Sequence, residues 1–249
     1  MTNSSIPPTT ATPPSSPPTS QPSTDPSTAP QSTPDPSTAP PASAFLLPTF
    51  EYIPHIPLSD SSIEAFIKAF IQPTQLHAHH ATLTRAQQNL LKREPELRAQ
   101  FPVRKVDDVL VLICGHGGRD QRCGILGPIL QAEFEDKLAR QNIRVLRGAP
   151  DAEAEDRSGV AVEAGQEGYL PAARVALISH IGGHKFAGNV IVYIPESWAG
   201  HALAGKGIWY GRVEPAHVEG IVAKTVIDGK VIMDHFRGGV GQGGEIMRL

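Results

Sequence analysis

The chain has 249 residues, a formal net charge of −3 and only two cysteines. Asp25 and Asp35 supply two of the negative charges, so the rest of the chain is nearly neutral. A neutral surface without a basic patch and interleaved aromatic residues gives no reason to expect a nucleic-acid partner. No apolar run reaches the roughly 18 residues that a membrane span needs. We therefore expect neither nucleic-acid binding nor a membrane span.

The first 48 residues are a low-complexity segment. They hold 14 of the 24 prolines and no lysine or arginine, and the hexapeptide Asp25–Pro30 is repeated at Asp35–Pro40. Sequence rich in Pro, Ser and Thr cannot bury enough apolar surface to offset its chain entropy. We predict that residues 1–48 form a disordered tail, and we favour a solvated linker over a phosphorylated or partner-binding segment.

Residues 49–104 are predicted to form a helical extension. Ser61 and Glu64 make a capping box that opens a helix, and Pro73 ends it. The apolar residues between them follow helical spacing: Ile63, Phe66, Ile67, Phe70 and Ile71. A second, more polar helix is predicted over residues 82–100, with an interruption near Pro95.

Residues 105–249 are predicted to form an α/β domain whose first half is a strand–helix–strand unit. Val106–Ile113 is a continuous apolar run of the kind found in buried strands. Pro128 is expected to start a helix that runs to about Gln141. Its inward side chains would be Ile129, Leu130, Phe134 and Leu138. Ile143–Leu146 would then return as a second strand, parallel to the first through a right-handed connection.

The second half of the domain begins after an acidic stretch, Gly148–Gly168, which we expect to be a mobile insertion. Arg174–Ile178 and Asn189–Ile194 are predicted strands, most simply an antiparallel pair, and Ile208–Val213 adds another. A helix should open at Pro215. Its buried face would hold Val218, Ile221, Val222 and Thr225. Gly238–Gly244 is expected to be a flexible tail.

A βαβ half followed by a ββα half is the thioredoxin-like order. The fold class predicted for residues 105–249 is therefore α/β, with a thioredoxin-like arrangement.

Two pairs of potential metal ligands follow predicted strands. Cys114 and Cys123 come after the first strand, and His180 and His184 come after the strand that ends at Ile178, with glycines around both pairs. Two thiolates and two imidazoles suit zinc or an iron–sulfur centre. Structural zinc sites usually separate paired cysteines by two to four residues, so the spacing here favours the larger cluster. Two thiolates and two imidazoles are also the Rieske ligand set, although Rieske motifs each mix one Cys with one His.

Several alternatives to this site stay open. The cysteines could be inert thiols or a redox dithiol of a thioredoxin-like thiol enzyme, and a structural zinc domain is a third interpretation. His116 is a competing ligand inside the cysteine loop, although we favour it as a hydrogen-bond donor. Lys185 and Asn189 could donate hydrogen bonds to sulfide or could only shape the loop. A further group, His77, His79 and His80, is expected to be a solvated loop.

The residues around these pairs resemble the sucrase/ferredoxin-like family, over roughly residues 43–240. The stretches that carry the resemblance are Leu112–Asp120, Cys123–Gly124, Ser179–Asn189 and Trp209–Val213. The resemblance implies a thioredoxin-like [2Fe–2S] ferredoxin. Its cluster ligands would be Cys114, Cys123, His180 and His184.

The resemblance also implies a one-electron carrier more than an enzyme, with a redox protein as its partner and a mitochondrial location. A presequence that would direct it there cannot be read, because no basic residue precedes Lys68. Family members carry a further upstream segment with its own cysteine-containing stretch, and Met1 resembles their interior. We therefore expect the chain to correspond to the later part of a longer protein.

Overall fold

The computed structural model describes residues 41–117, 121–148, 150 and 171–248, with the side chain of His184 excepted. The predicted tail falls outside the described residues up to residue 40. The predicted mobile insertion falls outside them except at residues 148 and 150. Within the described ranges, no helix is both long and apolar enough to cross a membrane.

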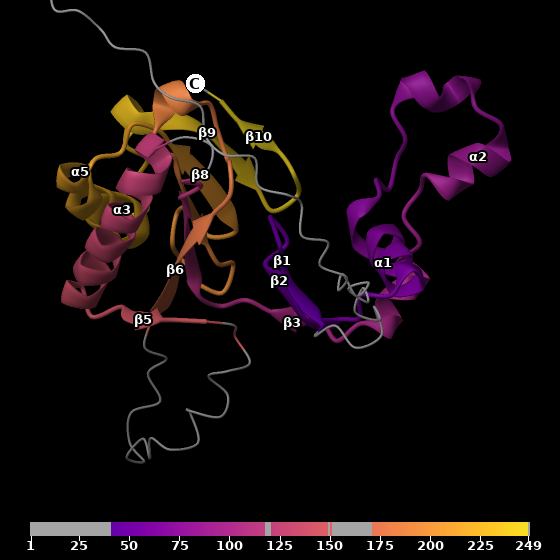
Figure 1. The fold of residues 1–249 in the computed structure, drawn as a ribbon, viewed down its shortest axis with the longest axis horizontal. Helices are drawn as coiled ribbons and strands as arrows, with labels where there is room; N and C mark the ends of the chain where they lie inside the picture. The colour runs from indigo at the N-terminus through magenta and orange to yellow at the C-terminus, as the bar shows by residue number, and fades with distance from the viewer. Residues whose placement is uncertain (1–40, 118–120, 149, 151–170, 249) are drawn as a thin grey trace, which may run out of the picture. The chain divides into compact units, whose positions relative to one another are not determined.

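A seven-stranded sheet carries most of the described structure (Figure 1). Its order is β10-β9-β8-β7-β4-β6-β5. The strands are β4 (Val109–Cys114), β5 (Arg144–Leu146), β6 (Ala172–Ile178), β7 (Val190–Ile194), β8 (Lys206–Tyr210), β9 (Phe236–Gly241) and β10 (Ile246–Met247). β6 is parallel to β4 and to β5, whereas β7, β8, β9 and β10 pair antiparallel.

Two helices cover one face of this sheet. They are α3 (Gln121–Arg140) and α5 (Pro215–Ile221), which continues as a π-helical turn, η6 (Val222–Ile227). Leu130, Phe134 and Leu138 of α3 are fully buried with the inward side chains of β4, β7 and β8. Figure 1 shows α3 and α5 against the same face, and the two helices contact each other. Each such side chain contributes about 1.5–3 kcal/mol when fully buried, so this layer holds the sheet in place.

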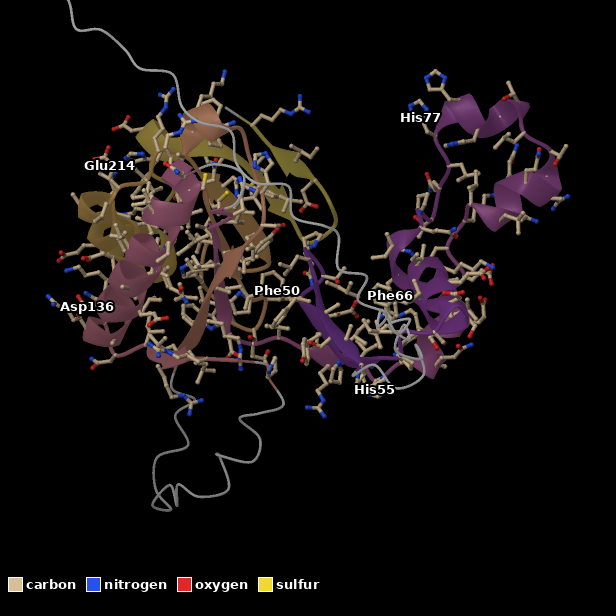
Figure 2. The ribbon with its side chains drawn as sticks, viewed as in Figure 1. Phe50, His55, Phe66, His77, Asp136 and Glu214 are labelled. Atoms are coloured by element: carbon tan, nitrogen blue, oxygen red, sulfur yellow. The ribbon has the colours of Figure 1, made fainter. Side chains whose placement is uncertain are left out.

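A smaller antiparallel sheet packs on the other face. It consists of β1 (Ala42–Leu46), β2 (Glu51–Ile56) and β3 (Arg104–Lys105) in that order. Phe50, labelled in Figure 2, and Tyr52 are buried against Leu110 and Tyr193 of the large sheet. The rings of Phe50 and Tyr193 meet edge to face with centroids 5.9 Å apart. Both faces of β4 are therefore covered, as its unbroken apolar sequence requires.

The helical segment follows β2 and precedes β3 in the sequence. It contains α1 (Asp60–Phe66), the π-helical turn η2 (Ile67–Ile71), α2 (Arg85–Leu90) and the 3-10 helices η3 (Ala78–Thr82) and η4 (Pro95–Gln100). The predicted capping box at Ser61 was wrong, because the side chain of Ser59 accepts the hydrogen bond of the Ser62 amide and caps α1 two residues earlier. The predicted helix over 82–100 is divided into α2 and η4, which begins at Pro95.

The domain division stays a prediction, but two of its details need correction. Residues 42–46 form β1 although they were assigned to the tail, and β2 and β3 are strands within or at the end of the predicted helical extension. Phe45 and Tyr52 explain this difference, because their rings pack 4.9 Å apart across the β1–β2 pair. Such cross-strand aromatic contacts stabilise a sheet. Short strands with polar neighbours show no clear alternating pattern from which the sheet could be predicted.

The α/β class and the βαβ-then-ββα order are confirmed by the strand order and directions, but one predicted pairing was wrong. β5 runs parallel to β4, as predicted, and forms the edge of the sheet with β6 between the two strands. β6 and β7 are not paired with each other, because β4 lies between them. Proximity in the sequence suggested a β6–β7 pair, and sequential strands are neighbours in only about two-thirds of cases.

Three further predictions were wrong in detail. α3 begins at Gln121 and contains Pro128 in its interior. Ile129 is 46 % exposed, unlike the other three predicted inward residues of that helix. Phe236–Gly241 forms β9, so Gly238–Gly241 belong to the sheet and not to a flexible tail. The side chain of Met247 and the backbone oxygen of Gly207 closely approach Gly239, so a Cβ there would force these neighbours to shift.

Candidate metal centre

The two predicted ligand loops meet at one edge of the sheet. Cys114 is the last residue of β4 and pairs with Ile178, the last residue of β6. The amide of Gly115 donates to the carbonyl oxygen of Ile178 over 3.0 Å, and the amide of Cys114 donates to that of Asn189 over 3.0 Å. Because neighbouring parallel strands end at the same edge, the loop after Cys114 and the loop after Ile178 lie together.

The two cysteines lie close together and away from solvent. One ligand atom each from Cys114, His116 and Cys123 can be chosen so that all three lie within 4.8 Å of one another. Each cysteine is 1 % exposed, and neither is in a disulfide. Cys123 lies in the first turn of α3, where the helix dipole favours negative charge. The position therefore suits a thiolate ligand.

His116 is closer to this group than the sequence suggested. Its Nδ1 lies 3.1 Å from Cys114 Sγ. Its ring meets the ring of His180 edge to face, with centroids 5.0 Å apart and an interplanar angle of 88°. His116 can therefore either donate a hydrogen bond to the Cys114 sulfur or turn a nitrogen to a metal.

The four predicted ligands are not all described. His184 begins the 3-10 helix η5 (His184–Phe186), and its side chain lies outside the described structure. The structure brings Cys114, His116 and Cys123 together, with the His180 ring next to His116. The ligand role of His180 and His184 stays a prediction.

Glycines allow the cysteine loop to pack directly on α3. A Cβ on Gly124 would overlap Cα of Gly117, and one on Gly127 would lie 2.9 Å from Cα of Gly115. These approaches need two residues without side chains on facing segments. They explain why α3 starts before Pro128, because its first turn is fixed by contact with the loop. The paired glycines in the sequence were the available signal for this packing.

Asn189 offers a donor beside the histidine loop. Its side chain is buried at 3 % exposure, and its Oδ1 lies 2.7 Å from where a Cβ on Gly182 would be. Its Nδ2 has no hydrogen-bond partner in the described part of the chain. A buried donor of this kind usually has a partner. Asn189 Nδ2 is therefore a candidate donor to a group bound beside the histidine loop.

The other histidine group does not resemble a metal site. His77, labelled in Figure 2, precedes η3, and its Nδ1 accepts the amide hydrogen of His79 over 3.2 Å. The two rings stack with centroids 4.6 Å apart. Within the described ranges, the only group of three or more Cys, His, Asp or Glu with metal-binding geometry is that of Cys114, His116 and Cys123.

The sucrase/ferredoxin-like family model matches residues 1–238. The chain belongs to this family. Sucrase/ferredoxin-like membership confirms the resemblance that the motifs around Cys114 and His180 carried.

Curated proteins that are similar in sequence to this sucrase/ferredoxin-like chain bear the name altered inheritance of mitochondria protein 32. The protein from Meyerozyma guilliermondii is 40 % identical over 139 residues, which is 56 % of this chain and 37 % of that protein. The protein from Clavispora lusitaniae is 36 % identical over 144 residues, 58 % of this chain and 38 % of that protein. The chain thus spans about two-fifths of the length of the curated relatives it matches.

Solved structures similar to this family member include a thioredoxin-like [2Fe–2S] ferredoxin from Aquifex aeolicus. It is 15 % identical, with a TM-score of 0.32, over 53 % of this chain and 91 % of that protein. Its Cys59Ser variant is 16 % identical with a TM-score of 0.31, over 51 % of this chain and 96 % of that protein. The thioredoxin-like assignment rests on the order and direction of β4, α3, β6, β7, β8 and α5.

Proposed function

We propose that this protein binds a [2Fe–2S] cluster and carries single electrons. The proposed cluster ligands are Cys114, Cys123, His180 and His184, and His116 donates a hydrogen bond to the Cys114 sulfur. The observation that carries the proposal is the group of two buried cysteines and His116 within 4.8 Å, with the His180 ring beside it. The family description and the names of the solved neighbours, which are ferredoxins, support the same cofactor.

The donor set fits an iron–sulfur cluster chemically. Thiolates from Cys114 and Cys123 would hold one iron, and imidazoles from His180 and His184 would hold the other. The buried Nδ2 of Asn189 supplies the hydrogen-bond donor that an inorganic sulfide or a ligand sulfur accepts. A cysteine sulfur bound to zinc could accept the same hydrogen bond, so the preference for the cluster over a zinc ion rests on the wide spacing of Cys114 and Cys123.

The surrounding residues control solvent and orientation at this centre. Both cysteines are buried, and the side chain of Leu177 lies against Gly115 at the start of the cysteine loop. The hydrogen bond from His116 to Cys114 would stabilise negative charge on that sulfur. The hydrogen bond between Cys114 and Asn189 keeps the cysteine loop and the histidine loop in register.

A bound cluster supplies a one-electron couple whose potential depends on its ligands. Imidazoles are neutral where thiolates are negative, so the proposed ligand set should raise the potential above the roughly −400 mV of all-cysteine plant-type centres. Hydrogen bonds from His116 and Asn189 to sulfur would raise it further, because they stabilise the more negative reduced state.

A thiol redox enzyme that uses Cys114 and Cys123 is less consistent with the site. Thiol–disulfide exchange requires an attacking thiolate that a substrate disulfide can reach. Both cysteines are 1 % exposed, so neither sulfur is open to such a substrate. The burial that disfavours exchange is what a protected metal centre needs.

Metal and sulfide analysis of the full chain, purified without oxygen, tests this proposal. We expect visible colour and about two irons and two acid-labile sulfides per chain. One zinc per chain with no sulfide would overturn the proposal in favour of a structural zinc domain. Colourless protein whose cysteines oxidise reversibly to a disulfide would overturn it in favour of a thiol enzyme.

We also propose that the protein acts in mitochondria. The support is the name shared by its curated relatives, altered inheritance of mitochondria protein 32. Fractionation of cells that express the full chain, with detection by antibody, tests this location. Recovery of the protein only in fractions other than the mitochondrial one would contradict this location.

A further inference from the structure

We propose that Lys185, Phe186, Arg212 and Arg237 form a docking surface for an acidic redox partner protein. We call these four residues the Phe186 patch. The inference rests on the proposed function, because it names the kind of protein with which the carrier exchanges electrons. One electron would pass between the two proteins in each encounter, so that one is oxidised as the other is reduced and no bond or proton is exchanged.

Three cations converge on one aromatic ring in this patch. The guanidinium carbon of Arg237 lies 3.3 Å from the centroid of the Phe186 ring. Lys185 Nζ and the guanidinium carbon of Arg212 lie 5.0 Å and 5.2 Å from it. All three are within the roughly 6 Å range of cation–π attraction. The ring therefore holds together charges that would otherwise repel one another.

The backbone of Arg212 has an unusual conformation that places it in the patch. Its φ is +57°, in the left-handed region that residues with a Cβ rarely adopt. Its amide donates to the carbonyl oxygen of Phe186 over 3.3 Å, and the amide of Val213 donates to that of Gly188 over 3.1 Å. These bonds tie the loop after β8 to the end of the histidine loop. Backbone strain of this kind concentrates at functional sites.

Arg237 is held from its other side by a glycine. A Cβ on Gly211 would lie 3.2 Å from Cγ and 3.3 Å from Nη1 of Arg237. The Arg237 side chain therefore packs on the backbone of Gly211, where no side chain is in the way. The amide of Gly211 also donates to the carbonyl oxygen of His235 over 2.9 Å. Gly211 and Phe186 thus confine the Arg237 side chain. A confined guanidinium loses little conformational entropy when it binds a carboxylate.

The charges of the patch are available to a partner. Lys185, Arg212 and Arg237 are all exposed, and none of them is in an ion pair with another described residue. Glu214, labelled in Figure 2, is the nearest carboxylate to Arg212 in the sequence. Its backbone carbonyl oxygen accepts the amide hydrogen of His217 over 2.9 Å, and its side chain forms no ion pair with the patch. Three neighbouring cations without an ion-pair partner among the described residues, on a chain of net charge −3, are a local feature and not a consequence of composition.

The patch adjoins the proposed cluster. Phe186 ends η5, the 3-10 helix that His184 begins. An electron carrier must bring the partner's cofactor close to its own, so the surface around the ligand loop is where contact is useful. Charge complementarity at such a surface steers encounters and raises the association rate without requiring high affinity. An acidic protein surface, which offers several carboxylates to two arginines and a lysine, fits these requirements.

Binding of an acidic peptide tests the surface directly. The probe is a polyglutamate of about 20 residues that carries one neutral dye, added at low salt to the full chain as purified, with fluorescence anisotropy as the readout. The triple variant Lys185→Gln, Arg212→Gln, Arg237→Gln should raise Kd about tenfold and reduce its salt dependence. The matched control is Arg85→Gln, Lys105→Gln, Arg144→Gln, which removes three exposed cations elsewhere. It should change Kd less than about twofold.

Two further variants separate charge from folding. The double variant Arg212→Lys, Arg237→Lys keeps the charges and should restore most of the binding. The double variant Lys185→Gln, Arg237→Gln leaves the unusual Arg212 backbone untouched and should still weaken binding. Circular dichroism of each variant establishes that the domain is folded.

Equal Kd values for the patch and control variants would overturn the docking surface. Inorganic phosphate that displaces the peptide more strongly than sodium chloride of the same ionic strength would also overturn it, because the site would then be one for small anions. Equal binding of a polylysine probe would exclude the charge selectivity. The proposed function is tested by a separate measurement: the absence of iron and sulfide in the same samples would contradict it, whatever the peptide binding shows.

Discussion

The backbone amide of Cys114 donates a hydrogen bond to the carbonyl oxygen of Asn189, with nitrogen and oxygen 3.0 Å apart. The bond joins the last residue of β4 to the residue that precedes β7, so the cysteine loop and the end of the histidine loop move together. The side chain of Asn189 is buried beside Gly182, and its Nδ2 has no partner within the described structure. Asn189 thus connects the two loops through its backbone and offers a donor through its side chain.

Replacement of this donor should lower the reduction potential of the protein. Asn189→Leu keeps a side chain branched at Cγ and the backbone hydrogen bond but removes the amide, whose hydrogen bond would stabilise the reduced, more negative centre. We expect full iron content and a more negative midpoint potential in a spectroscopic redox titration. Gln242→Leu, which removes the exposed amide that donates to Glu196, serves as the control and should leave the potential unchanged. An unchanged potential in Asn189→Leu would show that its Nδ2 does not reach the centre.

Substitution of the ligands should separate them from their neighbours. Cys114→Ser and Cys123→Ser should abolish the visible absorption and destabilise the domain, because the two loops lose their shared metal. His180→Ala and His184→Ala should also lose the cluster or alter its spectrum. His116→Ala should retain the cluster with a shifted potential, since it removes only the hydrogen bond to Cys114. Absorption spectra and iron content of the five variants decide the assignment.

The opposite result for the histidines would revise the ligand set. His116 lies close enough to both cysteines to be a ligand itself. If His116→Ala bleaches the protein while His184→Ala retains full colour and iron, His116 takes the fourth position and His184 does not. The set would then be Cys114, His116, Cys123 and His180.

Much of the fold could be predicted from local pattern. The apolar run that became β4 and the apolar face opened by Pro215 were recognisable, because burial on both sides of a strand or on one side of a helix leaves a clear periodicity. The meeting of the Cys114 loop and the loop after Ile178 was implied by the family resemblance and could not be derived from local pattern, because it depends on β4 and β6 being neighbours. Parallel neighbours end at the same edge whatever their sequence separation.

What the sequence did not reveal depends on contacts between distant residues. The neighbour of β4 could have been either β5 or β6, since both are short and apolar, and only packing of the whole sheet distinguishes them. The early start of α3 depends on the approach of Gly124 to Gly117. The position of His116 depends on a side-chain rotamer within a glycine-rich loop. None of these leaves a periodic signal.

The contact between Gly124 and Gly117 predicts opposite effects for two similar substitutions. Gly124→Ala would place a Cβ against Cα of Gly117, and the loop that carries Cys114 and His116 would have to shift. We expect a loss of about 1–3 kcal/mol in the free energy of unfolding together with reduced iron content. Urea denaturation and metal analysis measure the two effects.

Gly220→Ala is the matched control, because Gly220 also lies in a helix. The nearest atom to its new Cβ would be Ile232 Cδ1 at 4.0 Å, an ordinary contact. Alanine loses less backbone entropy than glycine in a helix, so this variant should gain up to about 1 kcal/mol. A Gly124→Ala protein as stable and as rich in iron as the parent would show that the loop does not need this close approach.

The ring of His201 makes two hydrogen bonds, one to η6 and one within the segment after β7. Its Nε2 donates to the carbonyl oxygen of Val226 over 3.0 Å, and its Nδ1 accepts the amide hydrogen of Leu203 over 3.2 Å. Both bonds together require the neutral ring with the proton on Nε2. Burial lowers the pKa of His201 below its ordinary value of 6.5, although the bond to Val226 opposes the shift.

The lowered pKa of His201 predicts a loss of stability in mild acid. The unfolded chain binds a proton at this histidine near pH 6.5, whereas the folded protein resists it until a lower pH, so the unfolded state holds more protons in that interval. The contribution of His201 is therefore complete above pH 6.5 and is lost as the pH falls from there towards the folded-state pKa. Urea denaturation at a series of pH values should show a smaller acid loss in His201→Gln than in the parent, with a lower stability at neutral pH. His55→Gln, at an exposed histidine of β2, should follow the parent. Parallel curves for the parent and His201→Gln would mean that protonation of His201 is not coupled to folding.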